Sequence, residues 1–348
     1  MATFYKVKIQ EVKQETASAV SVLFNIPPHL KSEFNFTSGQ YITIQQEIRG
    51  EEVRRAYSIC STPQSGELRV AIKAVEKGVF SIYANSHFKV GDEIEISIPE
   101  GRFLLNPETN KNYIAFAAGS GITPILSMVA SVLENEPTSN FTLVYGNKSV
   151  ADTIFYTQLN ALKESFSDRF KLHYIFSREN VKNILRGRID ENVTNYFVKN
   201  MYKETTFDAA FLCGPEEMIQ EVSKALKNNK IAKENIHFEL FIVAIDEEAT
   251  SAIKEGTTEI TVLLDDEKTT FTMQQTDSIL AASLRNDLDA PYSCQGGVCS
   301  SCLGKVTEGK AVMVKNSILT DSEVDEGLIL TCQAYPTTSK ITIDFDDV

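Results

Sequence analysis

The sequence predicts a multidomain protein: an antiparallel β-barrel first, then an α/β domain with a parallel sheet, then a small α+β domain. Three observations support this fold class. The chain has 348 residues, enough for two or three ordinary domains. Short β-rich runs give way near residue 106 to strands that alternate with helical patterns. A polar, acidic stretch near residue 250 then precedes a last region that is rich in cysteine.

Residues 1–105 have the pattern of an antiparallel barrel. Their β-rich runs are short, and pairs such as Pro27-Pro28, Ser38-Gly39 and Gly91-Asp92 place turns between them. Strands of this length and spacing are typical of barrels and sandwiches. The predicted strands are residues 5–12, 21–26, 41–48, 68–75 and 93–98.

Residues 106–243 have the pattern of an α/β domain. Apolar runs that suit buried strands alternate here with apolar residues at helical spacing, which is typical of βαβ units around a parallel sheet. We therefore expect this region to bind a nucleotide. The predicted strands are residues 113–117, 141–145, 171–176 and 209–212, and the predicted helices are residues 125–133, 153–166 and 216–228.

Residues 244–257 are polar, acidic and poor in apolar side chains, so we interpret them as a linker. The last domain, residues 258–348, begins with a hairpin of strands 260–264 and 269–273 around Asp265-Asp266. A short helix over 278–286 precedes a loop with three cysteines, and a strand over 341–345 comes last. This mixture predicts a small α+β domain.

The charge of the chain is negative and unevenly distributed. The net charge is −13, and residues 256–348 hold 15 acidic and 6 basic side chains, which gives −9. A surface of this sign excludes nucleic acid as a partner, because phosphates need a basic surface. The acidic region either steers a basic protein partner or is an ordinary solvated surface.

The N-terminus lacks the charged-then-apolar layout of a secretory signal, and no run of 18 apolar residues suits a membrane helix. We therefore expect a cytoplasmic protein without membrane insertion. Six cysteines in such a protein are not a disulfide framework, so they call for another explanation.

Four of the six cysteines follow a spacing that predicts an iron–sulfur site. Cys294, Cys299 and Cys302 are separated by four and two residues, and Cys332 follows at a distance. This is the C-x4-C-x2-C…C spacing of plant-type [2Fe–2S] proteins. A structural zinc site more often uses two C-x2-C pairs, whereas this sequence has one. Buried free cysteines are the remaining alternative.

Glycines surround these cysteines. Gly296 and Gly297 permit the dihedral angles of a tight loop that turns several cysteines inward. The segment 291–302 closely resembles the plant-type ferredoxins, and the resemblance covers roughly residues 258–348. It implies a β-grasp fold and makes the four cysteines the ligands of a [2Fe–2S] cluster.

Arg55, Ala56, Tyr57 and Ser58 form a first candidate motif for a flavin. An isoalloxazine ring needs an aromatic face to stack on and a hydrogen-bond donor near its N5 atom, and its pyrophosphate needs a cation. Tyr57, Ser58 and Arg55 supply these in that order. A motif of four residues is short, so on this evidence alone Tyr57 could equally be an ordinary aromatic residue of a strand.

A second candidate motif comprises Gly78, Val79, Phe80 and Ser81. A glycine with a serine three residues later, at a helix start, offers backbone N–H groups and a hydroxyl to a pyrophosphate. The pyrophosphate favours FAD over FMN. Together the two motifs resemble those of the ferredoxin–NADP reductase superfamily, although Lys77 replaces the first of the two glycines that usually begin the second motif. Lys73 is assigned to cofactor binding as well.

The stretch 117–124, AAGSGITP, follows a predicted buried strand and opens a predicted helix. Gly119 and Gly121 let the backbone approach a phosphate, and the helix N-terminus favours an anion. A lone G-x-G motif is weak evidence for a nucleotide site. In its position after a flavin barrel, however, this segment again resembles a motif of the reductase superfamily. The resemblance also assigns Thr123 and Pro124 to coenzyme binding.

The resemblance assigns two further segments. Cys213, Gly214 and Pro215 follow one another at the end of a predicted strand, and in the superfamily this segment lies beside the nicotinamide ring. Glu239 and Phe241 match a closing segment in which an acid and an aromatic lie near the flavin. Without the resemblance, Cys213 would be a small buried residue at a strand end. The residues assigned to catalysis are Ser58, Cys213 and Glu239.

The coenzyme is predicted from Ser177 and Arg178, which follow the strand that ends at residue 176. Enzymes that use NAD tend to place an acid there for the ribose 2′-hydroxyl, whereas serine and arginine suit a 2′-phosphate. Arg188 is a candidate second cation. These residues favour NADPH over NADH, unless the arginines are merely solvated surface residues.

The motifs occur in the order flavin barrel, nucleotide domain, ferredoxin, so the resemblance spans nearly the whole chain. This order resembles the reductase components of multicomponent oxygenases, in particular the phenylacetyl-CoA epoxidase reductases. It implies that electrons pass from NADPH to FAD, then to the [2Fe–2S] cluster and then to an oxygenase component of the diiron type. The alternatives are a reductase for a Rieske dioxygenase, a desaturase or a steroid hydroxylase, and a non-enzymatic redox sensor.

Overall fold

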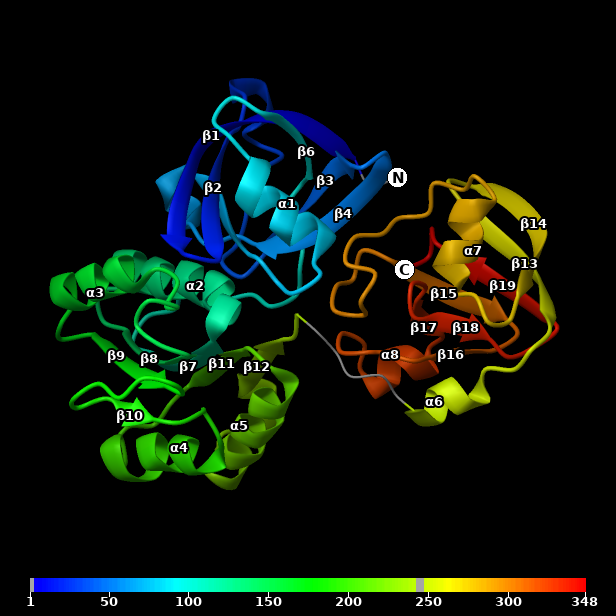
Figure 1. The fold of residues 1–348 in the computed structure, drawn as a ribbon. Helices are drawn as coiled ribbons and strands as arrows, with labels where there is room; N and C mark the ends of the chain where they lie inside the picture. The colour runs from blue at the N-terminus through cyan, green and yellow to red at the C-terminus, as the bar shows by residue number, and fades with distance from the viewer. Residues whose placement is uncertain (1–2, 242–246) are drawn as a thin grey trace. The chain divides into compact units, whose positions relative to one another are not determined.

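The computed structural model describes residues 3–241 and 247–348. Within them the chain forms two compact units, one of residues Phe4–Phe241 and one that contains residues 247–348. In Figure 1 the first unit runs from blue to green and the second from yellow to red. The predicted boundary between residues 243 and 244 lies outside the described residues.

The first unit begins with a six-stranded antiparallel sheet in the order β4-β3-β6-β1-β2-β5. A bridge between Ile59 and Val70 joins the end of β4 to β5 and closes this sheet into a barrel. Helix α1 (Val79–His87) packs Phe80 and Ala84 into the barrel core. The strands are β1 (Phe4–Thr16), β2 (Ala19–Asn25), β3 (Tyr41–Ile48), β4 (Glu51–Ser58), β5 (Leu68–Lys73) and β6 (Glu93–Ser97).

The five predicted strands of the barrel are confirmed, but the prediction missed β4. Its first five residues are Glu-Glu-Val-Arg-Arg, and this charge hides the strand pattern. Arg54 donates to Gln45 Oε1 of β3 over 2.7 Å, and it pairs with Glu52 of its own strand. Cross-strand partners, which a single strand cannot reveal, therefore make this segment a strand.

The first unit continues with a six-stranded parallel sheet in the order β10-β9-β8-β7-β11-β12. Both the strands and the helices that were predicted here are present, whereas β10, β12 and α4 are additional and short. The strands are β7 (Asn112–Ala118), β8 (Asn140–Asn147), β9 (Phe170–Phe176), β10 (Leu185–Arg186), β11 (Ala209–Cys213) and β12 (Ile236–Glu239). The α-helices are α2 (Ile122–Asn135), α3 (Tyr156–Ser165), α4 (Glu191–Asn195) and α5 (Glu216–Asn228).

The barrel and the parallel sheet share one core. Twelve residues of α2 are buried, and seven of these pack in one cluster with Ala19, Cys60 and Ala71 of the barrel. A buried hydroxyl pair strengthens the contact, because Ser38 Oγ of the barrel and Ser131 Oγ of α2 lie 2.6 Å apart. The two sheets therefore hold each other in place. Short 3₁₀ turns lie at Pro28–Leu30, Pro63–Ser65, Gly119–Gly121 and Lys233–Asn235, and a π-helix lies at Tyr196–Met201.

The second unit is a mixed five-stranded sheet, β14-β13-β19-β15-β17, with a separate β16-β18 pair. Its hairpin turns at Asp265 and Asp266, which have φ of 53° and 62°, as a tight two-residue turn requires. Helix α7 (Ile279–Arg285) packs Ile279 and Leu280 into the core of the sheet. The strands are β13 (Thr257–Leu264), β14 (Glu267–Gln274), β15 (Leu303–Glu308), β16 (Ala311–Met313), β17 (Leu328–Leu330), β18 (Ala334–Pro336) and β19 (Lys340–Asp344).

The helices of the second unit are α6 (Glu247–Ala252), α7 (Ile279–Arg285) and α8 (Asp321–Asp325). The predicted hairpin, α7 and the last strand are confirmed, and α6 lies within the stretch that was predicted to be a linker. No helix in residues 3–241 or 247–348 has the length and apolar content to cross a membrane.

Candidate functional site

The carboxyl ends of the parallel strands bring most of the predicted residues of the first unit to one edge. The chain leaves β7 into Gly119–Gly121 and leaves β11 into Gly214 and Pro215. These two segments touch: a Cβ on Gly121 would lie 2.0 Å from the carbonyl oxygen of Cys213. Only glycine fits there, so the glycine loop is held directly against the segment that follows β11. This edge is where open α/β sheets bind their ligands.

Ser58 of the barrel reaches the same edge. Its hydroxyl donates a hydrogen bond of 3.0 Å to Glu239 Oε2, although the two residues are 181 positions apart in the sequence. Ser58 is 5% exposed and Glu239 is 9% exposed. Strand pairing sets Glu239 of β12 beside Cys213 of β11. The structure thus brings together the three residues that were assigned to catalysis.

Cys213 is a neutral thiol in this setting. Burial raises its pKa well above the ordinary value, and the charge of Glu239 raises it further. Since the thiolate is the nucleophilic form of cysteine, Cys213 is not an activated nucleophile. It instead places a small, unreactive side chain at the end of β11.

The two flavin motifs meet in the barrel. Tyr57 of β4 lies with its ring centroid 5.6 Å from that of Phe80 in α1, at an interplanar angle of 39°. Burial raises the pKa of the Tyr57 hydroxyl, so the ring stays neutral. Arg55 donates from Nη1 to the carbonyl oxygen of Arg54 over 2.6 Å, and Ala56 pairs with Thr43 of β3. A neutral aromatic and a nearby guanidinium suit a flavin and its phosphates.

The start of α1 also suits a pyrophosphate. Gly78 precedes the helix, and a Cβ there would lie 2.4 Å from Ser81 Oγ. Ser81 Oγ accepts a hydrogen bond of 3.2 Å from the backbone N–H of Val75. Its own hydrogen is therefore available to a phosphate oxygen, as are the first N–H groups of the helix. The residues present fit FAD.

Lys77 has a left-handed backbone conformation, with φ of 60°. This explains why the related motif places a glycine at this position, since only glycine adopts such angles without strain. Lysine keeps the loop shape here at a cost in stability.

Replacing Lys77 by glycine should raise the free energy of unfolding by about 0.5–1 kcal/mol, because the relief of strain exceeds the chain entropy that glycine loses. Urea unfolding of the protein saturated with FAD measures the change. Lys77→Ala is the matched control, since it removes the ammonium group but keeps the strained angles. An equal gain in Lys77→Ala would assign the effect to charge instead.

Lys73 lies beside the glycine loop at the nucleotide edge. A Cβ on Gly119 would lie 3.4 Å from Lys73 Nζ, and Thr123 Oγ1 donates to the Ser120 carbonyl oxygen over 3.0 Å. Burial lowers the pKa of Lys73, and the charge of Lys148 lowers it further. A cation next to a glycine loop at a helix start suits the phosphates of a dinucleotide. Pro124 lies in the first turn of α2, where proline is tolerated.

Ser177 and Arg178 follow β9 at the same edge. Ser177 donates to the Asn147 carbonyl oxygen from its N–H over 2.9 Å and from its hydroxyl over 3.3 Å. Arg178 is exposed, while the neighbouring Glu179 accepts from the Val150 N–H over 2.8 Å. The Glu179 carboxylate thus bonds the backbone, and Arg178 remains an exposed cation at the end of β9. Arg188 and Phe241 are also exposed.

The four cysteines of the second unit form two pairs. The Cys299 thiol donates to Cys294 Sγ over 3.0 Å, and with the Gly296 N–H, 3.3 Å away, it lowers the pKa of Cys294 to about 7. A hydrogen bond from Cys302 likewise lowers the pKa of Cys332. Within residues 3–241 and 247–348, no three or more His, Cys, Asp or Glu side chains are grouped to hold a single metal ion.

Two cysteine pairs fit a cluster with two irons. A [2Fe–2S] cluster takes four cysteine sulfurs, and thiolate is the form that binds metal. In each pair the thiol that donates the hydrogen bond has a raised pKa, whereas its partner has a lowered one. The sequence did not point to the surrounding residues that hold this loop, among them Gln333, because a single glutamine carries no recognisable pattern.

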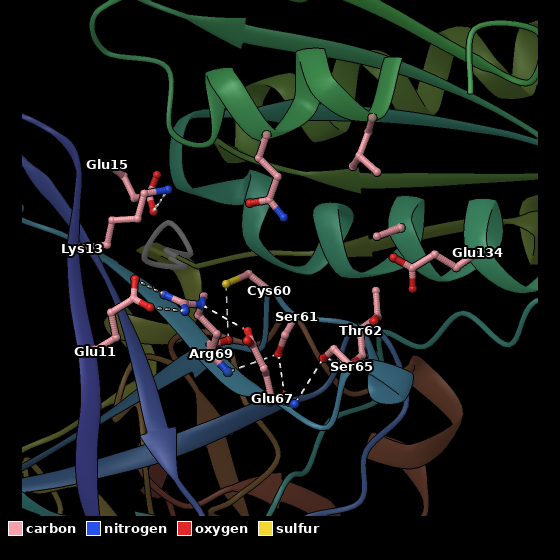
Figure 2. A pocket seen from close by; sticks show the side chains of 13 residues that line it. Glu11, Lys13, Glu15, Cys60, Ser61, Thr62, Ser65, Glu67, Arg69 and Glu134 are labelled. Atoms are coloured by element: carbon pink, nitrogen blue, oxygen red, sulfur yellow. Dashed lines mark hydrogen bonds and ion pairs between the residues drawn. The ribbon is translucent and has the colours of Figure 1, made fainter. Parts of the chain in front are cut away.

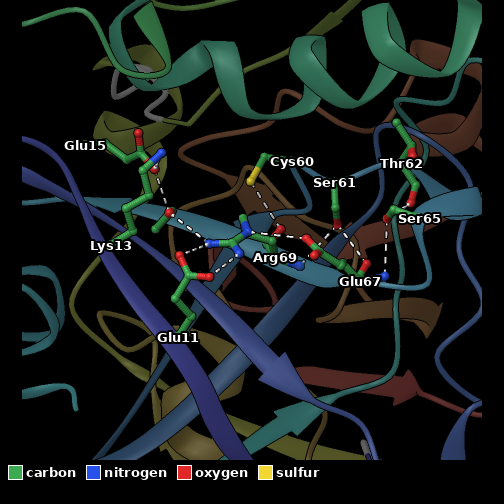
Figure 3. A network of polar contacts seen from close by, with 10 residues as sticks. Glu11, Lys13, Glu15, Cys60, Ser61, Thr62, Ser65, Glu67 and Arg69 are labelled. Atoms are coloured by element: carbon green, nitrogen blue, oxygen red, sulfur yellow. Dashed lines mark hydrogen bonds and ion pairs between the residues drawn. The ribbon is translucent and has the colours of Figure 1, made fainter. Parts of the chain in front are cut away.

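A cavity of about 310 Å³ lies elsewhere in the first unit (Figure 2). It is formed by β1, the chain from Cys60 to Arg69, α2 and α3, and none of the predicted site residues is among those that line it. Arg69 is the centre of its polar network (Figure 3). It donates to both carboxylate oxygens of Glu11, over 3.3 and 3.1 Å, and its N–H donates to Ser61 Oγ over 3.1 Å. This network links strands of the barrel, so we interpret its role as structural.

Three family models match the chain. They are described as "Oxidoreductase FAD-binding domain" over residues 6–104, "Oxidoreductase NAD-binding domain" over residues 116–224, and "2Fe-2S iron-sulfur cluster binding domain" over residues 262–337. Their order is that of the barrel, the parallel sheet and the cysteine-containing unit. The matches establish an oxidoreductase with FAD, a pyridine nucleotide and a [2Fe–2S] cluster as its cofactors.

Relatives match along the whole chain. A 1,2-phenylacetyl-CoA epoxidase component of Escherichia coli K12 is 38% identical over 351 residues, which cover 99% of each chain. The ferredoxin reductase component of the 3-ketosteroid-9-alpha-monooxygenase of Mycobacterium tuberculosis H37Rv is 30% identical over 98% of this chain and 96% of that one. The solved structure of phthalate dioxygenase reductase matches in fold, with a TM-score of 0.65 and 23% identity over 98% of each chain.

Proposed function

We propose that this chain carries electrons from NADPH to a diiron oxygenase of the phenylacetyl-CoA epoxidase type. The chain belongs to the family of oxygenase reductase components with FAD-binding, NAD-binding and C-terminal 2Fe-2S domains. Within the first unit, the observation that carries the proposal is the hydrogen bond between Ser58 and Glu239. It joins the flavin barrel to the nucleotide sheet at the edge where both cofactors must meet. The relative from Escherichia coli supports the choice of acceptor.

The protein residues have separate tasks in this function. When bound, FAD supplies the conversion of a two-electron hydride into single electrons, and the cluster accepts these singly. Ser58 is the donor we assign to flavin N5, which requires its single hydrogen to turn from Glu239 to the flavin when FAD is bound. Tyr57 is the aromatic face. Cys213 contributes only a small, neutral thiol to the nicotinamide side of the site. Phe241, an exposed aromatic, is assigned to cover the flavin in the absence of coenzyme.

The coenzyme is NADPH in this proposal, because Arg178 and Arg188 are exposed cations near the end of β9. Replacing Arg178 by alanine should lower kcat/KM for NADPH about 10-fold or more, since a charge-assisted hydrogen bond to a phosphate contributes about 1.5–3 kcal/mol. The value for NADH should hardly change. Lys171→Ala, at the start of β9, is the matched control. Equal losses for both coenzymes in Arg178→Ala would contradict a contact with the 2′-phosphate.

The acceptor is proposed to present a basic surface to the second unit. Acidic side chains are exposed on α8, which precedes β17 and Cys332, and they include Asp321 and Asp325. Opposite charge accelerates the encounter of two proteins at low salt. The 3-ketosteroid-9-alpha-monooxygenase reductases favour a steroid hydroxylase as the second candidate acceptor, because they also match along the whole chain.

The function is tested with the purified full chain. It should show flavin and iron–sulfur absorbance, should reduce ferricyanide and cytochrome c with NADPH, and should drive turnover of the diiron oxygenase. Absence of either absorbance refutes an FAD and [2Fe–2S] reductase. If the chain drives only a steroid hydroxylase or a Rieske oxygenase, the proposed acceptor is wrong and the proposed reductase activity stands. Negligible turnover with every artificial acceptor would instead indicate a redox sensor.

A further inference from the structure

Gln333 is buried directly after the last cluster cysteine, and its side chain joins the two segments that carry the cluster ligands. It is 8% exposed. Its Nε2 donates one hydrogen bond of 2.9 Å to the carbonyl oxygen of Gln295 and another of 3.0 Å to the carbonyl oxygen of Cys332. One amide group therefore ties the backbone next to Cys294 to the backbone of Cys332.

The position of Gln333 is fixed on every side. Its backbone N–H donates to the Leu330 carbonyl oxygen over 2.8 Å, and its own carbonyl accepts from the Val314 N–H over 3.0 Å. Its Cγ lies 3.1 Å from where a Cβ on Gly297 would be, so the glutamine chain fills the space beside that glycine. A side chain held by its backbone and by packing keeps its hydrogen bonds in one geometry.

The peptide that Gln333 holds is the one that faces a cluster sulfur. The Gln295 carbonyl and the Gly296 N–H belong to the same planar peptide group, and they point in opposite directions. Gln333 donates to the oxygen, while the N–H donates to Cys294 Sγ over 3.3 Å. Gln295 has φ of 51°, which is unfavourable for a residue with a side chain. The peptide therefore needs an outside group to hold this orientation.

We propose that Gln333 is a positioning residue that raises the reduction potential of the iron–sulfur cluster by aiming the Gly296 N–H at the Cys294 sulfur. This inference rests on the proposed function, which assigns a [2Fe–2S] cluster to the four cysteines. Hydrogen bonds to cluster sulfurs stabilise the reduced, more negative state. A hydrogen bond to the oxygen of a peptide also polarises its N–H, so the effect of Gln333 passes through the peptide to the sulfur.

Gln333→Met tests the proposal, because methionine has a similar length but no N–H donor. We expect the variant to reduce its cluster at a lower midpoint potential, to show altered g-values in the electron paramagnetic resonance spectrum, and to lose iron several-fold faster in air. The matched control is Gln275→Met. Gln275 donates to Thr258 Oγ1 and to the Thr338 carbonyl oxygen, over 3.0 and 3.3 Å, and not to the cluster loop. It should keep the potential of the natural protein.

The outcomes separate this proposal from the function on which it rests. A natural protein without a [2Fe–2S] spectrum would refute the function. A Gln333→Met protein with an unchanged potential and spectrum would refute the role of Gln333. If that variant holds no iron, Gln333→Asn decides, because the shorter amide keeps its donors but does not reach Gln295. A lowered potential in Gln333→Asn supports the proposal, whereas a natural potential or a second failure to hold iron overturns it.

Discussion

Replacing Cys332 by serine is expected to lower NADPH-driven cytochrome c reduction by at least about 100-fold, while NADPH still reduces the flavin. Loss of a residue that merely supports a metal ligand costs about 10–100-fold, and loss of the ligand itself should cost no less. Serine offers a hard oxygen where iron–sulfur clusters prefer a soft thiolate. Cys332 belongs to the second unit, whereas Ser58 and Glu239 belong to the first. Stopped-flow absorbance separates the two steps.

The matched control is Cys60→Ser. Cys60 is also a buried free cysteine, but it lies in the barrel and donates to the carbonyl oxygen of Arg69 over 3.3 Å. We expect it to keep full cytochrome c reduction. If Cys332→Ser lost its cluster and still reduced cytochrome c at the natural rate, the electrons would leave from the flavin, and the proposed relay would be wrong.

Replacing Ser58 by alanine is expected to slow the reduction of FAD by NADPH about 100-fold, since loss of a positioned donor or proton-transfer group typically costs this much. The hydroxyl is buried and oriented by Glu239, so no solvent molecule can replace it without cost. The affinity for NADPH should change little, because Ser58 belongs to the barrel and not to the glycine loop. Stopped-flow flavin reduction over a range of NADPH concentrations measures both quantities.

Ser97→Ala is the control for Ser58→Ala. Ser97 is a buried serine of β6 in the same sheet, where it accepts from the Thr43 N–H over 2.9 Å and donates to the Ile98 carbonyl oxygen over 2.8 Å. It should affect stability but not the rate of flavin reduction. Equal slowing in both variants would mean that Ser58 acts only through the stability of the barrel. Ser58→Thr, which keeps the hydroxyl, should recover part of the rate.

The parts of the fold that the sequence predicted are those with a local signal. The strand β3 was predicted at both ends, and so was the helix α5, because their apolar spacing is regular. The strand β4 was missed since its charged residues hide the strand pattern, and its pairing with β3 is not visible in one segment of sequence. The helix α6 was missed since its sequence is polar and short.

The candidate site divides in the same way. Cysteine spacing and the glycine loop are short-range patterns, so they could be read from the sequence. The bond between Ser58 and Glu239 joins distant positions, and it was reached only through a resemblance that named each residue separately. Gln333 could not be predicted at all, because its importance lies in which carbonyl groups the fold places around its amide. Lys77 was noted as a departure, but its positive φ explains the usual glycine only once the loop is seen.

The core shared by the barrel and the parallel sheet has a consequence for how such chains can be recombined. Since α2 packs with residues of the barrel, a chimaera joined near residue 106 would have to match side chains across an apolar interior. The second unit has an interior of its own, so a replacement there leaves the interior of the first unit intact. A chimaera is therefore easier to join before the second unit than between the barrel and the parallel sheet. We therefore expect a protein with an exchanged second unit to keep the stability of its first unit, whereas an exchanged barrel should lower it.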